Sequence, residues 1–174
     1  MKKKILVVII IFFVLLAGIL ITGVVLYNSD WANERSENYG SSSAGFKYYP
    51  QNEYNYWIGT GMDINEEEPY QECIIECNVD EGAIIFFVYN TNGFEFEEKD
   101  KYTLVREERI YESGTYVYDL SYLGYGSYYT CIYPEDAELP DEEEYVSASG
   151  NFITKHYYTN WQFLRGRIKG FFRL

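Results

Sequence analysis

This chain of 174 residues contains one histidine that could act in acid–base catalysis, His156. Any histidine-dependent mechanism must use that side chain, which lies beside Tyr157 and Tyr158 in a run typical of a strand. A lone strand histidine is usually structural or simply exposed. The sequence also lacks a nucleophile elbow, a P-loop, a dinucleotide fingerprint and a His-Glu-x-x-His motif. We therefore predict no catalytic residue and no cofactor, and we expect that the chain is not an enzyme.

The 27 acidic residues offer two further kinds of chemistry. Spacing alone does not reject paired carboxylates for glycoside hydrolysis, so an envelope hydrolase stays as the least favoured alternative. Cation binding would use Glu66–Glu68 or Asp141–Glu144. Calcium loops, however, alternate their carboxylates around a glycine turn, whereas consecutive acids point apart. Three cysteines and one histidine also match no zinc pattern, so we predict no metal site.

Binding chemistry is better represented, because tyrosines gather around one predicted corner of the chain. Exposed tyrosines stack on sugar rings or anchor protein interfaces. The candidate ligand contacts are Tyr122, Tyr125 and Tyr128. The alternative is purely structural, since tyrosine is also a good strand former.

A single apolar run extends from Ile5 to Leu26, and 18 of its 22 residues are Ile, Leu, Val or Phe. At ~1.5 Å rise per residue, a helix of this length matches the thickness of a bilayer core. Lys2–Lys4 precede the run and Arg35 alone follows it closely. This charge bias predicts a cytoplasmic stub over residues 1–4, a transmembrane helix over 5–26 and an extracytoplasmic remainder. A cleaved secretory signal is the alternative, but its apolar stretch is normally only ~7 to 15 residues, so we favour an uncleaved signal anchor.

The formal net charge of −13 excludes nucleic-acid binding, because the chain would repel a phosphate backbone. All acidic residues fall within 27–154, and the last twenty residues contain none. Residues 27–45 are polar and rich in Ser and Gly, which is typical of a flexible linker.

Residues 46–160 show short runs of Tyr, Val, Ile, Phe and Thr separated by turn residues, the pattern of an all-β domain. Cys73, Ile75, Cys77 and Val79 share one face of a strand. A turn at Asp80–Gly82 is predicted to make a hairpin with Ala83–Tyr89, which is apolar on both faces and therefore central. Further strands are predicted at 54–58, 101–111, 115–120, 127–133 and within 145–158, with an acidic loop over 134–144. We predict an antiparallel two-layer sandwich of about seven strands.

Part of this domain resembles known modules. Ile75–Cys77, Tyr129–Cys131 and Gly126 resemble the paired strands of immunoglobulin-like domains, although no Trp lies between the two cysteines and Tyr89 stands in its place. The segment from Gly114 to Tyr128 is equally similar to the jelly-roll modules of membrane-anchored bacterial surface proteins. The resemblance implies a sandwich and leaves its topology open.

The cysteines allow one disulfide if the domain is exported. Cys77 and Cys131 are the candidate pair, on facing strands, and would close a loop of about 55 residues worth ~4 kcal/mol. Cys73 and Cys77 lie four residues apart on one strand, ~13 Å between Cα atoms, and cannot bridge. The alternative is three buried, reduced thiols.

The basic, aromatic segment 161–174 has two interpretations. As a strand it would place its cations on one face. As a helix, Trp161, Leu164, Ile168 and Phe171 would form an apolar stripe with basic flanks, suited to an anionic membrane surface. Gly166 and Gly170 each cost a helix roughly 1 kcal/mol, so we favour the strand.

Together these features predict a single-pass membrane protein with an extracytoplasmic binding or assembly module. The partner would be an envelope protein or a glycan, and the main alternative is a cell-envelope carbohydrate-binding module.

Overall fold

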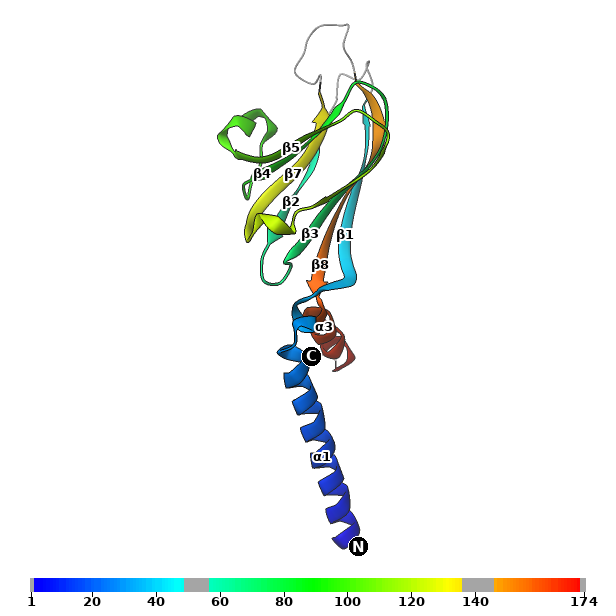
Figure 1. Cartoon of the computed structure of the whole chain (residues 1–174), viewed down its shortest axis with the longest axis vertical. Coiled ribbons are helices and arrows are strands. Elements are labelled where there is room, and N and C mark those ends of the chain that lie inside the picture. Colours follow the sequence, from blue (N-terminus) through cyan, green and yellow to red (C-terminus); the bar gives the residue numbers. More distant parts are fainter. Residues whose placement is uncertain (1, 49–56, 136–145, 173–174) are drawn as a thin grey trace. The chain divides into compact units, whose positions relative to one another are not determined.

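The computed structural model describes residues 2–48, 57–135 and 146–172 (Figure 1). The helices are α1 (Lys2–Tyr27), α2 (Asp30–Asn33) and α3 (Asn160–Phe172), with two short 3-10 helices, η1 (Phe96–Lys101) and η2 (Ser121–Leu123). The strands are β1 (Arg35–Tyr48), β2 (Ile58–Ile64), β3 (Tyr70–Glu81), β4 (Ile84–Asn90), β5 (Thr103–Ile110), β6 (Gly114–Asp119), β7 (Gly126–Pro134) and β8 (Ser147–Thr159). Predictions that fall on Met1, on Tyr54 and Tyr56, on the acidic loop beyond Glu135 and on the last two residues lie outside the described residues.

The chain forms two compact units. One consists of Met1–Ser36 and Tyr158–Leu174 and contains the helices α1, α2 and α3. The other, Glu37–Tyr157, contains nearly all of both sheets.

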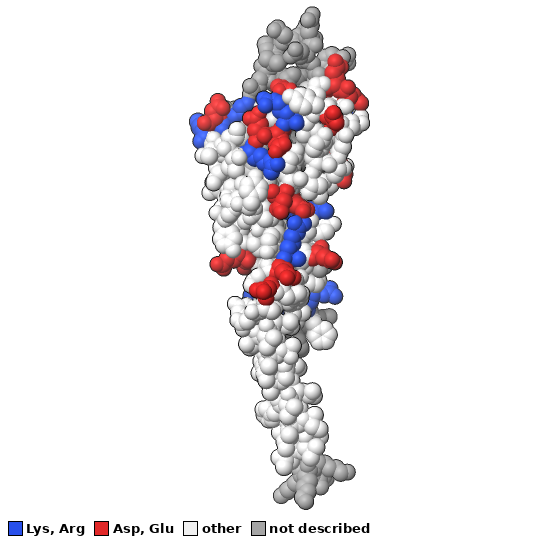
Figure 2. All heavy atoms as spheres, viewed as in Figure 1, with Lys and Arg blue, Asp and Glu red and all other residues white. Residues whose placement is uncertain are grey.

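Helix α1 contains the one segment of the described chain that is long and apolar enough to cross a membrane, Ile5–Tyr27. No residue of this segment is buried inside the protein. Figure 2 shows this segment as a column without charged side chains. A signal sequence meets the same criteria of length and composition, so the helix is a candidate span. The predicted N-terminal apolar helix is confirmed.

The strands build two four-stranded sheets, sheet A in the order β1-β8-β3-β6 and sheet B in the order β2-β7-β4-β5. The pairs β3–β6, β3–β8, β2–β7, β4–β5 and β4–β7 are antiparallel. Consecutive strands alternate between the sheets except for β4 and β5. The predicted all-β sandwich is therefore confirmed, with one strand more than expected among the described residues.

This strand order is that of a jelly roll and differs from the immunoglobulin arrangement. The predicted hairpin between the strands flanking Asp80–Gly82 is wrong, because β3 belongs to sheet A and β4 to sheet B. The turn itself is present, and Gly82 adopts a φ of 74° that suits glycine. Gly124 plays the same part before β7, with a φ of 79°.

Strand β4 is covered on both faces, as its two-sided apolar sequence predicts. Ile84, Phe86 and Val88 enter the main core between the sheets. Ile85, Phe87 and Tyr89 enter a second core on the outer face of sheet B. Stacked rings build this second core, including Phe87 on Tyr133 at 5.0 Å and Phe94 on Tyr129 at 4.7 Å between centroids. Much of the tyrosine content is therefore structural.

The predicted linker over 27–45 is wrong from Arg35 onward, because β1 begins there and pairs with β8 at the edge of sheet A. The small residues of β1 allow it to lie close to β8. A Cβ at Gly40 would collide with the imidazole of His156, so glycine permits the close approach. The strand ends in the core, where Phe46 and Tyr48 are buried. Composition alone could not distinguish such an edge strand from a linker.

The C-terminal segment is a helix, α3, and the favoured strand is wrong. A reciprocal capping box starts the helix: the Gln162 amide donates to Thr159 Oγ1 at 3.2 Å, and the Thr159 amide donates to Gln162 Oε1 at 2.7 Å. Such a box satisfies two N–H groups that a helix start otherwise leaves without partners. Together with the helical spacing of Trp161, Leu164 and Ile168, it outweighs the cost of the two glycines.

Candidate functional site

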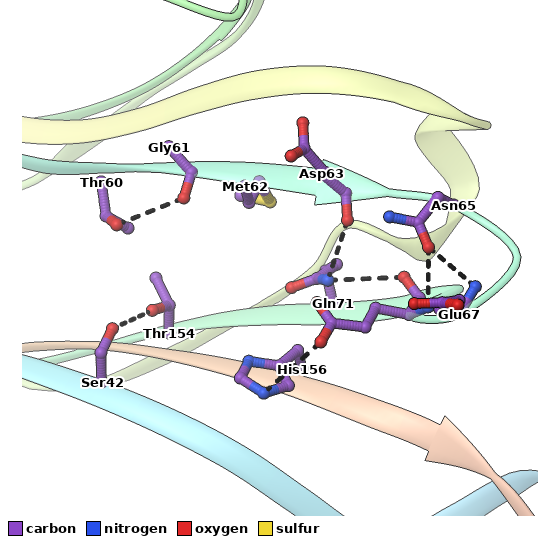
Figure 3. Close-up of a pocket in the computed structure, with 11 residues that line it drawn as sticks. Ser42, Thr60, Gly61, Met62, Asp63, Asn65, Glu67, Gln71, Thr154 and His156 are labelled. Atoms are coloured by element: carbon purple, nitrogen blue, oxygen red, sulfur yellow. Dashed lines mark hydrogen bonds and ion pairs between the residues drawn. The ribbon is translucent and has the colours of Figure 1, made fainter. Parts of the chain in front are cut away.

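A polar cavity of about 420 Å³ opens in the sandwich unit, where the edge strand β1 and its neighbour β8 face β2 (Figure 3). Ser42 comes from β1, and Thr154 and His156 from β8. The remaining lining comes from β2, from the loop after it and from the start of β3: Thr60, Gly61, Met62, Asp63, Asn65, Glu67, Glu68 and Gln71.

Gln71 is the buried polar group of this cavity, with 5% of its surface exposed. It lies on the inner face of β3, two residues before Cys73, and its strand partner on β8 is His156. The Nε2 group donates to the carbonyl oxygens of Asp63 and Glu68, both at 3.4 Å. These two carbonyls fix the amide orientation, because a flipped amide would turn its oxygen toward two other oxygens.

The Gln71 Oε1 atom therefore points away from those carbonyls and into the cavity (Figure 3). Among the described residues no group donates a hydrogen bond to it. A buried amide oxygen that no protein group satisfies needs a donor from outside the protein, which in an open polar cavity is water or a ligand.

His156 and Glu68 stand at the mouth of the cavity, about one third exposed each, with Nε2 and Oε1 3.9 Å apart. The loop carrying Glu68 is held by Asn65, whose Oδ1 accepts the amides of Glu67 at 2.7 Å and Glu68 at 3.1 Å. The Asp63 carboxylate points away from the cavity (Figure 3) and accepts a hydrogen bond from Ser127 at 2.6 Å. Within the described ranges, no three His, Cys, Asp or Glu side chains converge as metal ligands.

The candidate ligand contacts Tyr122, Tyr125 and Tyr128, together called the tyrosine corner, are only partly exposed. Tyr122 is 65% exposed and Tyr125 is 68% exposed, as a ligand contact requires. Tyr128 is 4% exposed and belongs to the main core, so its prediction as a ligand contact is wrong. Its hydroxyl donates to the carbonyl of Leu123 at 2.8 Å and braces the turn before β7. Side-chain alternation along β7 places Tyr128 on the inner face together with Ile132.

The candidate disulfide is also wrong, because all three cysteines are free and buried. Cys77 faces the core between the sheets, as Cys73 does, whereas Cys131 lies in the second core on the outer face of sheet B. The two side chains are thus separated by the thickness of sheet B. Burial raises the pKa of Cys73 and of Cys131 to about 12, and raises the pKa of Cys77 as well.

We expect three alkylated cysteines when the unreduced protein is denatured and treated with iodoacetamide, read by mass spectrometry. In the folded protein Cys77, the most exposed of the three, should react first. Because the folded state favours neutral thiols, the stability that Cys73 and Cys131 contribute should fall as pH rises from 9.0 toward about 12. A deficit of two alkyl groups in the denatured sample that is restored after reduction with dithiothreitol would reveal a disulfide and contradict free thiols.

The cavity residues carry signals that sequence reasoning passed over. Gln71 is a polar residue in phase with the apolar face of Cys73, Ile75 and Cys77, and such an exception marks a special position. His156 is likewise in phase with the buried Phe152. The loop residues Asn65 and Glu68 gave no such signal, because only the meeting of β2, β3 and β8 brings them to the cavity.

No family model and no curated protein matches the chain. Among solved structures, a chain of Bacillus endospore appendages, described as a novel family of disulfide-linked pili, is 10% identical with a TM-score of 0.43, covering 75% of this chain and 96% of that one. The Yersinia pseudotuberculosis-derived mitogen is 7% identical with a TM-score of 0.34, covering 71% and 87%. A chain of the cowpea mosaic virus top component is 8% identical with a TM-score of 0.34, covering 73% and 86%. Such low TM-scores carry no functional argument.

Proposed function

We propose that the protein is a membrane-anchored, extracytoplasmic binding module whose ligand occupies the cavity beside Gln71. The observation that carries this proposal is the Gln71 Oε1 atom, which is buried, aimed into the cavity and without a donor among the described residues. A ligand that donates a hydrogen bond to this oxygen would recover the cost of its burial.

Membrane anchoring is supported by the exposed, uncharged surface of α1 from Ile5 to Leu26. An isolated apolar helix of this length is unfavourable in water and favourable in a bilayer. Lys2–Lys4 at the start of α1, ahead of its apolar segment, support a cytoplasmic N-terminus, and both sheets would then lie outside the cell.

The cavity favours a small polar ligand rich in O–H or N–H donors. Gln71 Oε1 and the Glu68 carboxylate are acceptors, and the Ser42 and Thr154 hydroxyls, 2.7 Å apart, can exchange roles. No Lys, Arg, Phe, Tyr or Trp side chain is among the described lining residues. Sugar hydroxyls and a primary ammonium both supply hydrogen-bond donors to these acceptors. A sugar ligand agrees with the carbohydrate-binding alternative.

We propose binding rather than catalysis at this cavity. The 3.9 Å between His156 and Glu68 exceeds hydrogen-bond length, and the Ser42 hydroxyl is engaged with Thr154. The side chains present therefore suit recognition of a ligand better than activation of a nucleophile.

We expect Gln71→Leu to weaken ligand binding by about tenfold or more, because the loss of one acceptor in a buried site leaves the ligand donor unpaired. The full chain in nanodiscs would be titrated with N-acetylglucosamine and glucose in one arm and with spermidine and ethylamine in the other, by calorimetry. Gly40→Ala should weaken binding too, since the new Cβ displaces the His156 ring.

Tyr125→Ala is the matched control, because Tyr125 is exposed and does not line the cavity. It should leave the affinity unchanged. Binding that survives Gln71→Leu and Gly40→Ala but disappears in Tyr125→Ala would transfer the site to the tyrosine corner. If neither the sugars nor the amines bind, the proposed ligand class is contradicted.

A further inference from the structure

Helix α3 has the composition of an interfacial helix. Its residues Leu164, Ile168 and Phe171 lie on one side of the helix at spacings of three and four residues. Ile168 is 48% exposed and Phe171 is 83% exposed. The cations Arg165 and Lys169 border one side of this apolar stripe and Arg167 the other.

The three cations are available to an external partner. All are exposed, and none forms an ion pair within the described residues. Helix α3 itself contains no acid. Their charge is therefore not neutralised locally, in contrast to Arg106 and Arg109 of the sandwich, which pair with glutamates at 2.7 to 2.8 Å.

The start of α3 lies beside the end of α1. The rings of Tyr27 and Trp161 meet edge to face with centroids 5.3 Å apart. The Asn160 side chain donates to the carbonyl of Trp31 at 3.0 Å, and its amide donates to the carbonyl of Glu34 at 3.0 Å. Tyr and Trp are the residues that prefer the boundary between a bilayer and water. If α1 crosses the membrane, the first turn of α3 is therefore at the membrane surface.

We propose that α3 lies along the outer surface of the membrane that α1 spans and binds anionic lipid headgroups. Ile168 and Phe171 enter the boundary of the acyl region, and Arg165, Arg167 and Lys169 contact lipid phosphates. This inference rests on the membrane anchoring proposed above, and does not depend on the cavity.

The weakness of α3 in water gives the proposal a measurable consequence. A helix of 13 residues with glycines at 166 and 170 is marginal on its own, and the half that follows Leu164 is exposed. A membrane that covers the apolar stripe would stabilise this half.

Hydrogen exchange of residues 165–171 tests this in the full-length protein, reconstituted in phosphatidylcholine or in phosphatidylcholine mixed with phosphatidylglycerol. We expect exchange to be slower in the anionic membrane by up to about 100-fold, roughly fivefold for each of three cations. The variant R165Q/R167Q/K169Q should lose this difference. K47Q/K99Q/K101Q removes the same charge from the sandwich and should retain it.

Equal exchange in both membranes, or an undiminished difference in R165Q/R167Q/K169Q, would overturn the proposal. Resistance of the same samples to carbonate extraction reports α1 insertion separately. Carbonate-resistant protein with an unprotected α3 would refute only the lipid contact, whereas extracted protein would refute the anchoring itself.

Discussion

Replacing Phe86 by alanine is expected to destabilise the sandwich by about 3 to 5 kcal/mol, the cost of removing a large side chain from a core that cannot collapse. Phe86 is fully buried on β4. Its ring stacks on Tyr118 of β6 at 4.4 Å between centroids and meets Phe152 of β8 at 6.4 Å. Because β4 belongs to sheet B and its two partners to sheet A, the ring joins the two layers.

Urea unfolding of the full chain in detergent, followed by tryptophan fluorescence, measures this loss. Leu104→Ala on the adjacent strand β5 is the control, since Leu104 is 44% exposed and its truncation should cost under about 1 kcal/mol. Similar losses for the two variants would mean that the interior between the sheets is not packed as described.

Gly150→Ala should cost roughly 3 kcal/mol or more and reduce the yield of folded protein. Gly150 lies on β8 opposite Cys77 of β3. An added Cβ would overlap the carbonyl oxygen of Glu76 and come within 2.9 Å of the Cys77 Cα. Both obstacles are backbone atoms, so relief requires the β3–β8 pairing itself to shift.

Gly45→Ala provides the comparison, because a Cβ there meets its nearest neighbours, on β8, at an ordinary 3.8 Å. It should be neutral or slightly stabilising, since alanine restricts the unfolded chain more than glycine does. The two variants share chemistry and differ only in available space. Equal stabilities would show that β8 is not held against β3 at Gly150.

The sequence predicted the layers better than their connections. Alternation of Cys73, Ile75 and Cys77 identified the buried face of β3, and the two-sided β4 was recognisable as central. Pairing partners were not predictable in this way, because a glycine turn such as Gly82 serves a hairpin and a crossing between sheets equally well. The failed disulfide has the same origin, since the face to which Cys131 points depends on the register of β7.

The candidate site was harder to predict than the core. Tyrosine content drew attention to the corner, yet Tyr128 is buried and many other rings fill the second core. Gln71 was detectable as a polar residue on a buried face, and His156 as one in phase with the buried Phe152, but the cavity that they line exists only because β1, β2, β3 and β8 meet there. At the C-terminus, the Thr159 and Gln162 capping box was a readable signal that glycine content obscured.

The pairing of β1 with β8 has a consequence for biogenesis. In sheet A, β1 and β3 both pair with β8, the last strand of the chain. Neither of these two pairings can form until β8 is available. Contacts this distant in sequence make folding slow, on the order of milliseconds to seconds. If the chain is exported as proposed, sheet A is completed only after the last strand has crossed the membrane, and a product truncated before Ser147 would expose the edges of β1 and β3 to aggregation.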